Sequence, residues 1–296
     1  MSDITLSIVI LSYNRIEEIK TNVVSLCNEI KKNTIDFEII VVDNASDDGS
    51  QSFLKDLEKK YNFLTVVLAN KNYGVAKGRS IGYKHAKGDY ILSIDDDTRI
   101  TIGEIKAMIT ELAKFPNAGI LSPQIKHYKT SQNQSYHGEE VKKIANFHGA
   151  CYLIKREILD EVGYLDEECT FGGEEIDYSI RTYNKGFEVI YTPNIIVYHN
   201  NFIRKGVVGA ERRYKWVYNF IRIHFKHFPI LIAFKFSFRY LISHIFSLLK
   251  KKKIIDFLSL LIAALKGAKK GSKIHETVSV KTIAFYNNIN LRPDFG

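Results

Sequence analysis

Short apolar runs rich in β-branched residues alternate with helix-like stretches through the first hundred residues of this chain. The runs have the composition of buried parallel strands and lie at residues 7–11, 37–42, 64–68 and 90–94. The helical candidates lie near residues 15–32, 50–61, 74–87 and 101–114. Strands that alternate with helices form right-handed βαβ units, so the pattern predicts an α/β protein with a doubly wound sheet. Ligands of such sheets bind beyond the carboxyl ends of the strands.

Polar residues follow all four runs, and three adjacent carboxylates, Asp95, Asp96 and Asp97, follow the fourth. With strand-like geometry Asp95 and Asp97 point to one side and Asp96 points away. A cation relieves the repulsion between crowded carboxylates, and oxygen ligands suit Mg²⁺ or Mn²⁺. Such an ion can bridge a diphosphate and neutralise charge on a leaving group. We assign Asp95 and Asp97 to a metal site; a solvated turn is the alternative.

Residues 72–82 open a predicted helix with three glycines and two cations. Small residues let the backbone approach a ligand closely, and a helix N-terminus favours anions. We therefore place Asn72, Gly74 and Lys77 in the nucleotide site and expect Lys77 or Arg79 to reach phosphate. Close packing of the glycines on the sheet is the alternative explanation. The segment is neither a dinucleotide fingerprint nor a Walker A loop.

A Gly-Gly turn leads several carboxylates into a predicted helix at about residues 174–184. Transfer of a group to a hydroxyl needs a carboxylate that accepts its proton, and one of Glu174, Glu175 and Asp177 is the best candidate. The helix dipole stabilises negative charge at this position, which is the alternative explanation for at least one of them. His199 is expected to be an ordinary side chain unless it completes an Asp/Asp/His metal set.

The region from residue 118 to residue 200 predicts a mixed α+β structure with strands at residues 148–154 and 189–199. The three cysteines have no CxxC spacing, which is typical of a reduced protein with buried thiols. The first residues lack the basic segment and the long apolar run of a signal peptide. We therefore expect a cytoplasmic protein.

Basic charge is concentrated in the last third of the chain. Residues 201–296 carry 19 Lys and Arg against 4 Asp and Glu, whereas residues 1–200 carry 23 against 29. The tail begins with an amphipathic helix pattern whose apolar face includes Val217, Ile221 and Phe225. The opposite, polar face consists of Arg212, Lys215, Asn219, Arg222 and Lys226.

Two apolar stretches, residues 228–249 and 254–265, flank a run of lysines at residues 250–253. Charges inside the first stretch and the shortness of the second argue against membrane-spanning helices. Basic residues beside apolar surface attract anionic headgroups, so we expect peripheral attachment to the cytoplasmic face of a membrane. Packing of these helices on the preceding domain, or in a homodimer interface, is the alternative. The aliphatic content and the lack of a recognisable reader module argue against nucleic acid as a partner.

Seven motifs, taken in their order along the chain, resemble the family 2 glycosyltransferases from residue 5 to residue 200. They are SIVILSYNR, VVDNASDDGS, NYGVAKGRSIGY, GDYILSIDDD, HGACYLIKREILDEVGYLDE, GGEEIDYSIR and GFEVIYTPNIIVYH. The resemblance implies a GT-A domain over residues 1–200, in which a Rossmann-like nucleotide-binding mixed sheet is flanked by helices. Residues 201–296 would then form a helical, amphipathic C-terminal extension.

The family's nucleotide and metal residues can be transferred by position. Asp43 matches the carboxylate that reads the nucleotide base, and Tyr13 and Asn14 would line the same pocket. Asp95 and Asp96 would contact the nucleotide sugar. Asp97 would ligate the metal, and His199 matches the histidine that completes metal or diphosphate binding.

The sugar pocket can be transferred in the same way. The stretch His148, Gly149 and Ala150 resembles the one that lines the acceptor and the donor sugar, and we also place Asp177 there. Related members read Glu-Asp at the catalytic pair, where Glu-Glu stands in this sequence. The usual base therefore falls on Glu175, with Glu174 as the alternative.

The resemblance implies an inverting glycosyltransferase that moves a sugar from a UDP- or dTDP-linked donor, assisted by Mn²⁺ or Mg²⁺. The acceptor would be a hydroxyl of a lipid-linked molecule or of a surface polysaccharide. An inactive homologue that serves as a scaffold for glycan assembly is the alternative, because of the Glu-for-Asp departure. A nucleotidyltransferase is disfavoured because residues 12–15 are not a Gly-rich basic loop.

Overall fold

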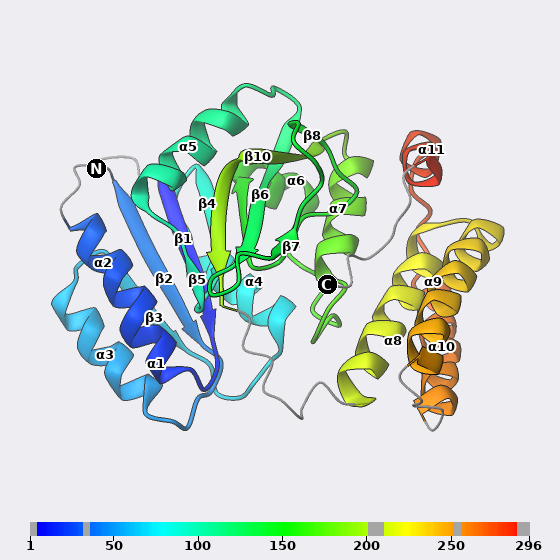
Figure 1. Ribbon diagram of the computed structural model, residues 1–296, viewed down its shortest axis with the longest axis horizontal. Coiled ribbons are helices and arrows are strands. Elements are labelled where there is room, and N and C mark those ends of the chain that lie inside the picture. The colour runs from blue at the N-terminus through cyan, green and yellow to red at the C-terminus, as the bar shows by residue number, and fades with distance from the viewer. Residues whose placement is uncertain (1–4, 32–35, 201–209, 251–255, 289–296) are drawn as a thin grey trace.

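One mixed β-sheet with helices on both faces forms the first 200 residues (Figure 1). The computed structural model describes residues 5–31, 36–200, 210–250 and 256–288. Within these residues the 10-stranded sheet has the central order β3-β2-β1-β4-β9-β6-β10-β5, and β7 and β8 pair with β6 and β10. The strands are β1 (Leu6–Ser12), β2 (Phe37–Asp43), β3 (Leu64–Leu68), β4 (Tyr90–Asp95), β5 (Thr98–Arg99), β6 (Ala118–His127), β7 (Asn133–Ser135), β8 (Lys142–Lys143), β9 (Cys151–Lys155) and β10 (Glu188–His199).

The four predicted strands are confirmed and run parallel to one another, in the order β3-β2-β1-β4. The sheet becomes mixed beyond β4, because β9 runs antiparallel to both β4 and β6. The last long strand, β10, is parallel to β6 and antiparallel to the short β5. This pairing brings His199, at the end of β10, opposite Thr98, directly after the acidic triplet.

Helices cover the sheet on both sides because alternate residues of its strands face two cores. Ile8 and Ile10 pack with α2, α3 and α5, whereas Val9 packs on the opposite side with α4, α6 and α7. The helices of this part are α1 (Ile16–Glu18), α2 (Val24–Ile30), α3 (Ser50–Lys60), α4 (Val75–His85), α5 (Ile102–Ala113), α6 (Arg156–Val162) and α7 (Glu174–Asn184), with a π-helical segment (Ile19–Val23) between α1 and α2. All three cysteines are buried and free, as the sequence predicts.

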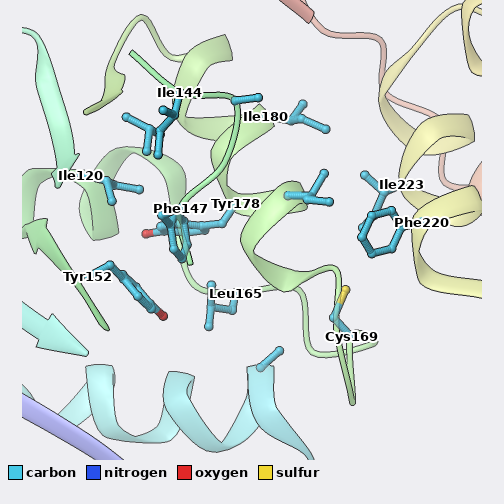
Figure 2. Packing of buried hydrophobic residues seen from close by; sticks show 14 of the residues in the cluster. Ile120, Ile144, Phe147, Tyr152, Leu165, Cys169, Tyr178, Ile180, Phe220 and Ile223 are labelled. Atoms are coloured by element: carbon cyan, nitrogen blue, oxygen red, sulfur yellow. The ribbon is translucent and has the colours of Figure 1, made fainter. Parts of the chain in front are cut away.

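The helices that follow in the described residues lie beyond α7, away from the sheet (Figure 1). They are α8 (Ala210–His227), α9 (Ile230–Lys250), α10 (Asp256–Lys273) and α11 (Val280–Asn288). Phe220 and Ile223 of α8 point towards α7 and extend the core on that side (Figure 2). Within the described residues, no helix combines the length and the apolar character that crossing a membrane requires. The lysine run at residues 251–253 lies outside the described residues.

The second half of the predicted polar face of α8 does not face solvent. Asn219 and Arg222 are almost completely buried, and Lys226 is mostly buried, whereas Arg212 and Lys215 at the start of the helix reach solvent. The wheel separated the apolar and polar side chains correctly but missed that this half of the polar face meets complementary groups of the preceding domain. Packing of this helix on the domain, the alternative considered for the tail, is therefore what α8 does.

Candidate active site

The carboxyl ends of three parallel strands meet at one edge of the sheet. Ser12 of β1 lies beside Asp43 of β2 in the ladder, and Leu11 lies beside Asp95 of β4. The polar residues that follow these strands therefore converge, as the strand order predicts. The candidate site is built on this edge.

Asp95, Asp97 and His199 form a set suited to a metal ion. One potential ligand atom from each lies within 4.8 Å of the others. The Nε2 atom of His199 is 2.9 Å from Asp97 Oδ1 and 3.7 Å from Asp95 Oδ2. On its other side, His199 donates from Nδ1 to Gln134 Oε1 at 2.6 Å, which leaves Nε2 directed at the two carboxylates. Two hard oxygen donors and an imidazole fit Mn²⁺ or Mg²⁺ with open positions for diphosphate oxygens.

Arg15, which the sequence analysis missed, also contacts this set. Its guanidinium donates to Asp97 Oδ2 at 2.7 Å. Burial alone would raise the pKa of Asp97, but His199 and Arg15 outweigh it and hold that pKa below its ordinary value. The clustering of cationic groups on Asp97 indicates a carboxylate that stays ionised and can serve as a ligand.

Asp96 faces the other way, as strand geometry predicts, and its carboxylate is buried. Ser12 donates to Asp96 Oδ2 at 2.6 Å, and the side chain of Asn22 donates to the Asp96 carbonyl at 2.8 Å. Burial raises the pKa of Asp96 well above its ordinary value, although Arg15 opposes this. The structure thus gives Asp96 contacts with β1 and the π-helical segment, not a place beside Asp95 in the cleft.

The predicted base-reading residues lie at the ends of β1 and β2. Asp43 is buried; its Oδ1 accepts from the Ser46 amide at 2.9 Å and from Gln51 Nε2 at 3.0 Å, and its Oδ2 has no hydrogen-bond partner within the described part of the chain. Tyr13 is 45% exposed and offers an aromatic face. Asn14 adopts a left-handed conformation with φ of 53°, and its amide donates to Ser46 Oγ.

Asn44, another residue that the sequence analysis missed, organises the loop before α4. Its side chain donates to Asn72 Oδ1 at 3.0 Å and accepts from the Tyr73 amide at 2.9 Å. Gly74 has a positive φ of 80°, and a Cβ there would overlap the Thr170 carbonyl. Gly74 therefore packs against the loop that leads into α7, and Asn72 accepts from the Gly74 amide at 2.8 Å.

The two cations at the start of α4 have different partners. Lys77 forms an ion pair with Glu167 at 2.8 Å and is about a third exposed. Arg79 is buried, and its Nη2 donates to Asp95 Oδ1 at 2.6 Å and to the Gly149 carbonyl at 2.7 Å. Its Nη1 lies 3.9 Å from Glu174 Oε1. Arg79 thus lies between the metal set and the carboxylates of α7, so one guanidinium joins the two acidic groups.

Glu174 and Glu175 begin α7 and differ in their surroundings. Glu174 is buried, and burial together with Glu175 raises its pKa to about 8. Glu175 is half-buried and lies against Gly149, where a Cβ would overlap Glu175 Oε1. Burial also raises the pKa of Glu175, although Arg79 opposes it. With its pKa raised to about 8, Glu174 is mostly protonated at neutral pH, so the pair does not carry two full negative charges there.

His148, Gly149 and Ala150 border the same cleft. The Ala150 amide donates to His148 Nδ1 at 3.1 Å, and the His148 ring lies edge-on to His199 with ring centres 6.2 Å apart. Burial lowers the pKa of His148 to about 3, so its imidazole is neutral. The Ala150 carbonyl accepts from the Asp95 amide at 3.1 Å, which fixes the backbone of the metal set.

Asp177 does not line the cleft, contrary to its predicted place in the sugar pocket. It is completely buried and accepts from Arg181, Lys226 and His227 at 2.7–2.8 Å. Burial would raise the pKa of Asp177, but these cationic partners hold it well below its ordinary value. The prediction failed because two of the partners come from α8, about fifty residues later in the sequence.

A mixed sheet of this order, with an Asp-x-Asp triplet and a histidine at its carboxyl edge, defines a glycosyltransferase of the GT-A fold. Residues 7–176, more than half of the chain, match the sequence profile "Glycosyl transferase family 2". The chain belongs to that family.

Similar proteins place the chain among bacterial and other glycosyltransferases. It is 26% identical over 253 residues to "dTDP-rhamnosyl transferase RfbF" of Shigella flexneri, which covers 77% of this chain and 82% of that protein. It is 24% identical over 237 residues to "Chondroitin synthase" of Escherichia coli, covering 66% of this chain but spanning only 34% of that protein. The crystal structure of GalNAc-T7 with UDP, GalNAc and Mn²⁺ has a TM-score of 0.63 at 17% identity and covers 77% of this chain and 49% of that one. This last likeness shows the fold.

Proposed function

We propose that this protein transfers a sugar, with inversion, from a UDP- or dTDP-linked donor to a hydroxyl of a lipid-linked or surface-glycan acceptor. The observation that supports the proposal is the position of Arg79, whose guanidinium lies 2.6 Å from Asp95 and 3.9 Å from Glu174 and so joins the proposed metal set to the proposed base pair. Inversion by direct displacement needs the metal at the leaving diphosphate and the base at the attacking hydroxyl, on opposite sides of the reacting sugar carbon.

The nucleotide would occupy the end of the site formed by β1 and β2. A ring N–H of uracil or thymine would satisfy the unpartnered Oδ2 of Asp43, and Tyr13 would stack on the base. Asp95, Asp97 and His199 would hold Mn²⁺ or Mg²⁺, which supplies positive charge to the leaving diphosphate. Lys77, whose ion pair with Glu167 is partly exposed, would exchange that partner for a phosphate oxygen.

Glu175 would accept the proton of the acceptor hydroxyl as the new bond forms. Its side chain is one methylene longer than the usual Asp, and the missing Cβ of Gly149 leaves room for it. Glu174, with its pKa raised to about 8, would stay protonated at neutral pH and keep a second negative charge away from Glu175. These features favour an active enzyme. The alternative, an inactive scaffold, is supported only by the presence of Glu where related members have Asp.

One relative of which the chain covers 82% gives a first guide to the class of donor. That relative is named as a dTDP-rhamnosyl transferase, so dTDP-linked deoxyhexoses are the first donors to test, followed by UDP-hexoses. The protein is expected to release nucleoside diphosphate from one of these donors with Mn²⁺ or Mg²⁺, and not with EDTA. A panel of donors with a nucleoside-diphosphate assay measures this, and no metal-dependent release from any donor would contradict the proposed function.

The helices α9 and α10 would attach the protein to the cytoplasmic face of an anionic membrane. On α9 the apolar side chains Leu231, Phe234 and Phe238 recur at helical spacing and are exposed, with Lys235 and Arg239 among them. On α10 the exposed apolar side chains are Leu258, Leu261, Ile262 and Leu265. Apolar side chains interleaved with exposed cations are the pattern of a helix that lies in a membrane interface.

Replacing this apolar surface is expected to release the protein from vesicles. Burying one Leu or Phe side chain contributes about 1.5–3 kcal/mol, so L231E with F238E should weaken binding to phosphatidylglycerol vesicles at least about 100-fold. Vesicle co-sedimentation measures the effect, with V280E, a substitution of a similarly exposed aliphatic on α11, as the matched control. Unchanged binding by the double variant contradicts the attachment, and conversion of a dimer to a monomer would assign the surface to a homodimer instead.

A further inference from the structure

The turn that precedes the base helix lies directly against α8. Gly172 and Gly173 have positive φ angles of 75° and 96°. A Cβ on Gly172 would overlap the Trp216 ring, and one on Gly173 would lie 3.1 Å from Asn219 Cβ. Both the backbone conformation and the lack of space therefore exclude larger residues. The turn and α8 fit each other at van der Waals distance.

Asn219 fixes the carbonyl groups of this turn. Its side chain is buried, and its Nδ2 donates to the Gly172 carbonyl at 2.8 Å and to the Phe171 carbonyl at 3.2 Å. The ring of Trp216 stacks on that of Phe171 with centres 5.8 Å apart. These contacts hold the residues immediately before Glu174 and Glu175.

A buried ionic network holds α7 one turn further along. Asp177 accepts from Lys226 Nζ and His227 Nε2, both at 2.8 Å, and Lys226 also donates to Asp166 at 2.7 Å. Asp166 in turn accepts from Arg222 at 2.8 Å. Because the groups are buried, removal of one partner leaves an uncompensated charge, and the network strongly favours one position of α7.

The two sets of contacts act on the back of the base helix. Residues two apart on an α-helix point in directions about 200° apart, so Asp177 faces α8 while Glu175 faces Gly149 and the cleft. We infer that α8 is a positioning element of the catalytic site: Asn219 and Lys226 set the position of α7 and thereby aim Glu175 at the acceptor hydroxyl. This inference rests on the proposed function. It assigns to the C-terminal helices a role in catalysis in addition to attachment.

The test separates positioning from folding and from donor binding. N219A removes two hydrogen bonds to the turn, and K226Q removes one charge from Asp177 while Arg181 and His227 remain. A displacement of about 1 Å in a catalytic group can cost about 100-fold, so each variant should lose 10- to 100-fold in kcat for nucleoside-diphosphate release. The dissociation constants of UDP and dTDP, measured with Mn²⁺, should stay within about twofold of the wild-type values. The proposed nucleotide and metal residues lie outside α7 and α8. K215M, which breaks an exposed ion pair with Glu211 on the same helix, is the matched control.

Two further readouts make the result decisive. Trp216 is the only tryptophan in the sequence, so its fluorescence reports whether the contact with the turn is retained, and a thermal melt reports folding. K226R, which keeps the charge, should recover most of the lost rate. A folded N219A or K226Q with wild-type kcat, or with a loss confined to donor affinity, would overturn the positioning role. A wild-type protein without metal-dependent release would contradict the proposed function itself, and this inference with it.

Discussion

Replacing Asp97 by Ala is expected to abolish the metal-dependent release of nucleoside diphosphate. Asp97 contributes a ligand oxygen to the set with Asp95 and His199, and it also accepts from Arg15. Charge stabilisation by a metal ion contributes several kcal/mol to a reaction of this kind, so loss of its ligand should lower the rate at least about 1,000-fold. Nucleoside-diphosphate release with saturating Mn²⁺ measures the effect.

In the absence of metal, D97A should bind nucleotide with the affinity of the wild type. The proposed base-reading residues, Asp43 at the end of β2 and Tyr13 after β1, are unchanged in this variant. Titration of Mn²⁺ into the protein by calorimetry should show weaker binding to D97A and to H199Q. D56A, which removes an exposed carboxylate paired with Lys59, is the control and should have no effect. Wild-type release and Mn²⁺ affinity in D97A would remove the metal site from the mechanism.

Much of the sheet was predictable because its signals are local. The parallel strands β1, β2 and β4 are short apolar runs that are mostly buried, and the residues after them must meet at the carboxyl edge. The acidic triplet could be placed at this edge for this reason, and strand alternation correctly predicted that Asp96 points away from Asp95. The pattern of residues 118–200 predicted further strands, and the resemblance to the family added the mixed sheet and the role of His199.

The residues that connect distant segments were not predictable in the same way. Arg79 looked like a phosphate ligand because it begins a glycine-rich helix, but its partners Asp95 and Gly149 come from β4 and the loop before β9. Asn44 belongs to no motif that indicates its role. Its role is to hold the loop before α4 through hydrogen bonds to Asn72 and Tyr73. Likewise, a helical wheel shows which side chains of α8 are polar. It does not show that Lys226 of α8 pairs with Asp177 of α7.

Replacing Glu175 by Gln is expected to remove transfer and leave donor binding intact. General base catalysis contributes about 100- to 10,000-fold, and Gln cannot accept the proton. E174Q should retain activity within a few-fold at pH 7, because Glu174, with a pKa raised to about 8, is already protonated there. Acceptor-dependent release measures both. If E174Q is inactive and E175Q is active, the base is Glu174.

The pH dependence follows from the same pair. A base works in its ionised form, and burial raises the pKa of Glu175, so the rate should rise with pH through a value above the usual one for Glu. The wild-type protein should also lose stability as pH rises from the unfolded pKa of Glu towards 8, because the folded state retains the Glu174 proton that the unfolded state gives up. E174Q should lack that part of the loss in a melt without metal.

Gly149 allows a direct test of whether the longer base uses the space beside it. A Cβ at this position would overlap Glu175 Oε1, so G149A should displace the carboxylate and lower the rate about 100-fold. In E175D the carboxylate is one methylene shorter and withdraws from Gly149, so the same Ala should cost much less in that background. Non-additivity of this sign is the expectation for two groups in contact. Equal losses in both backgrounds would mean that the Glu175 carboxylate lies elsewhere during the reaction. The space beside Gly149 would then not explain why Glu can stand at this position in place of Asp.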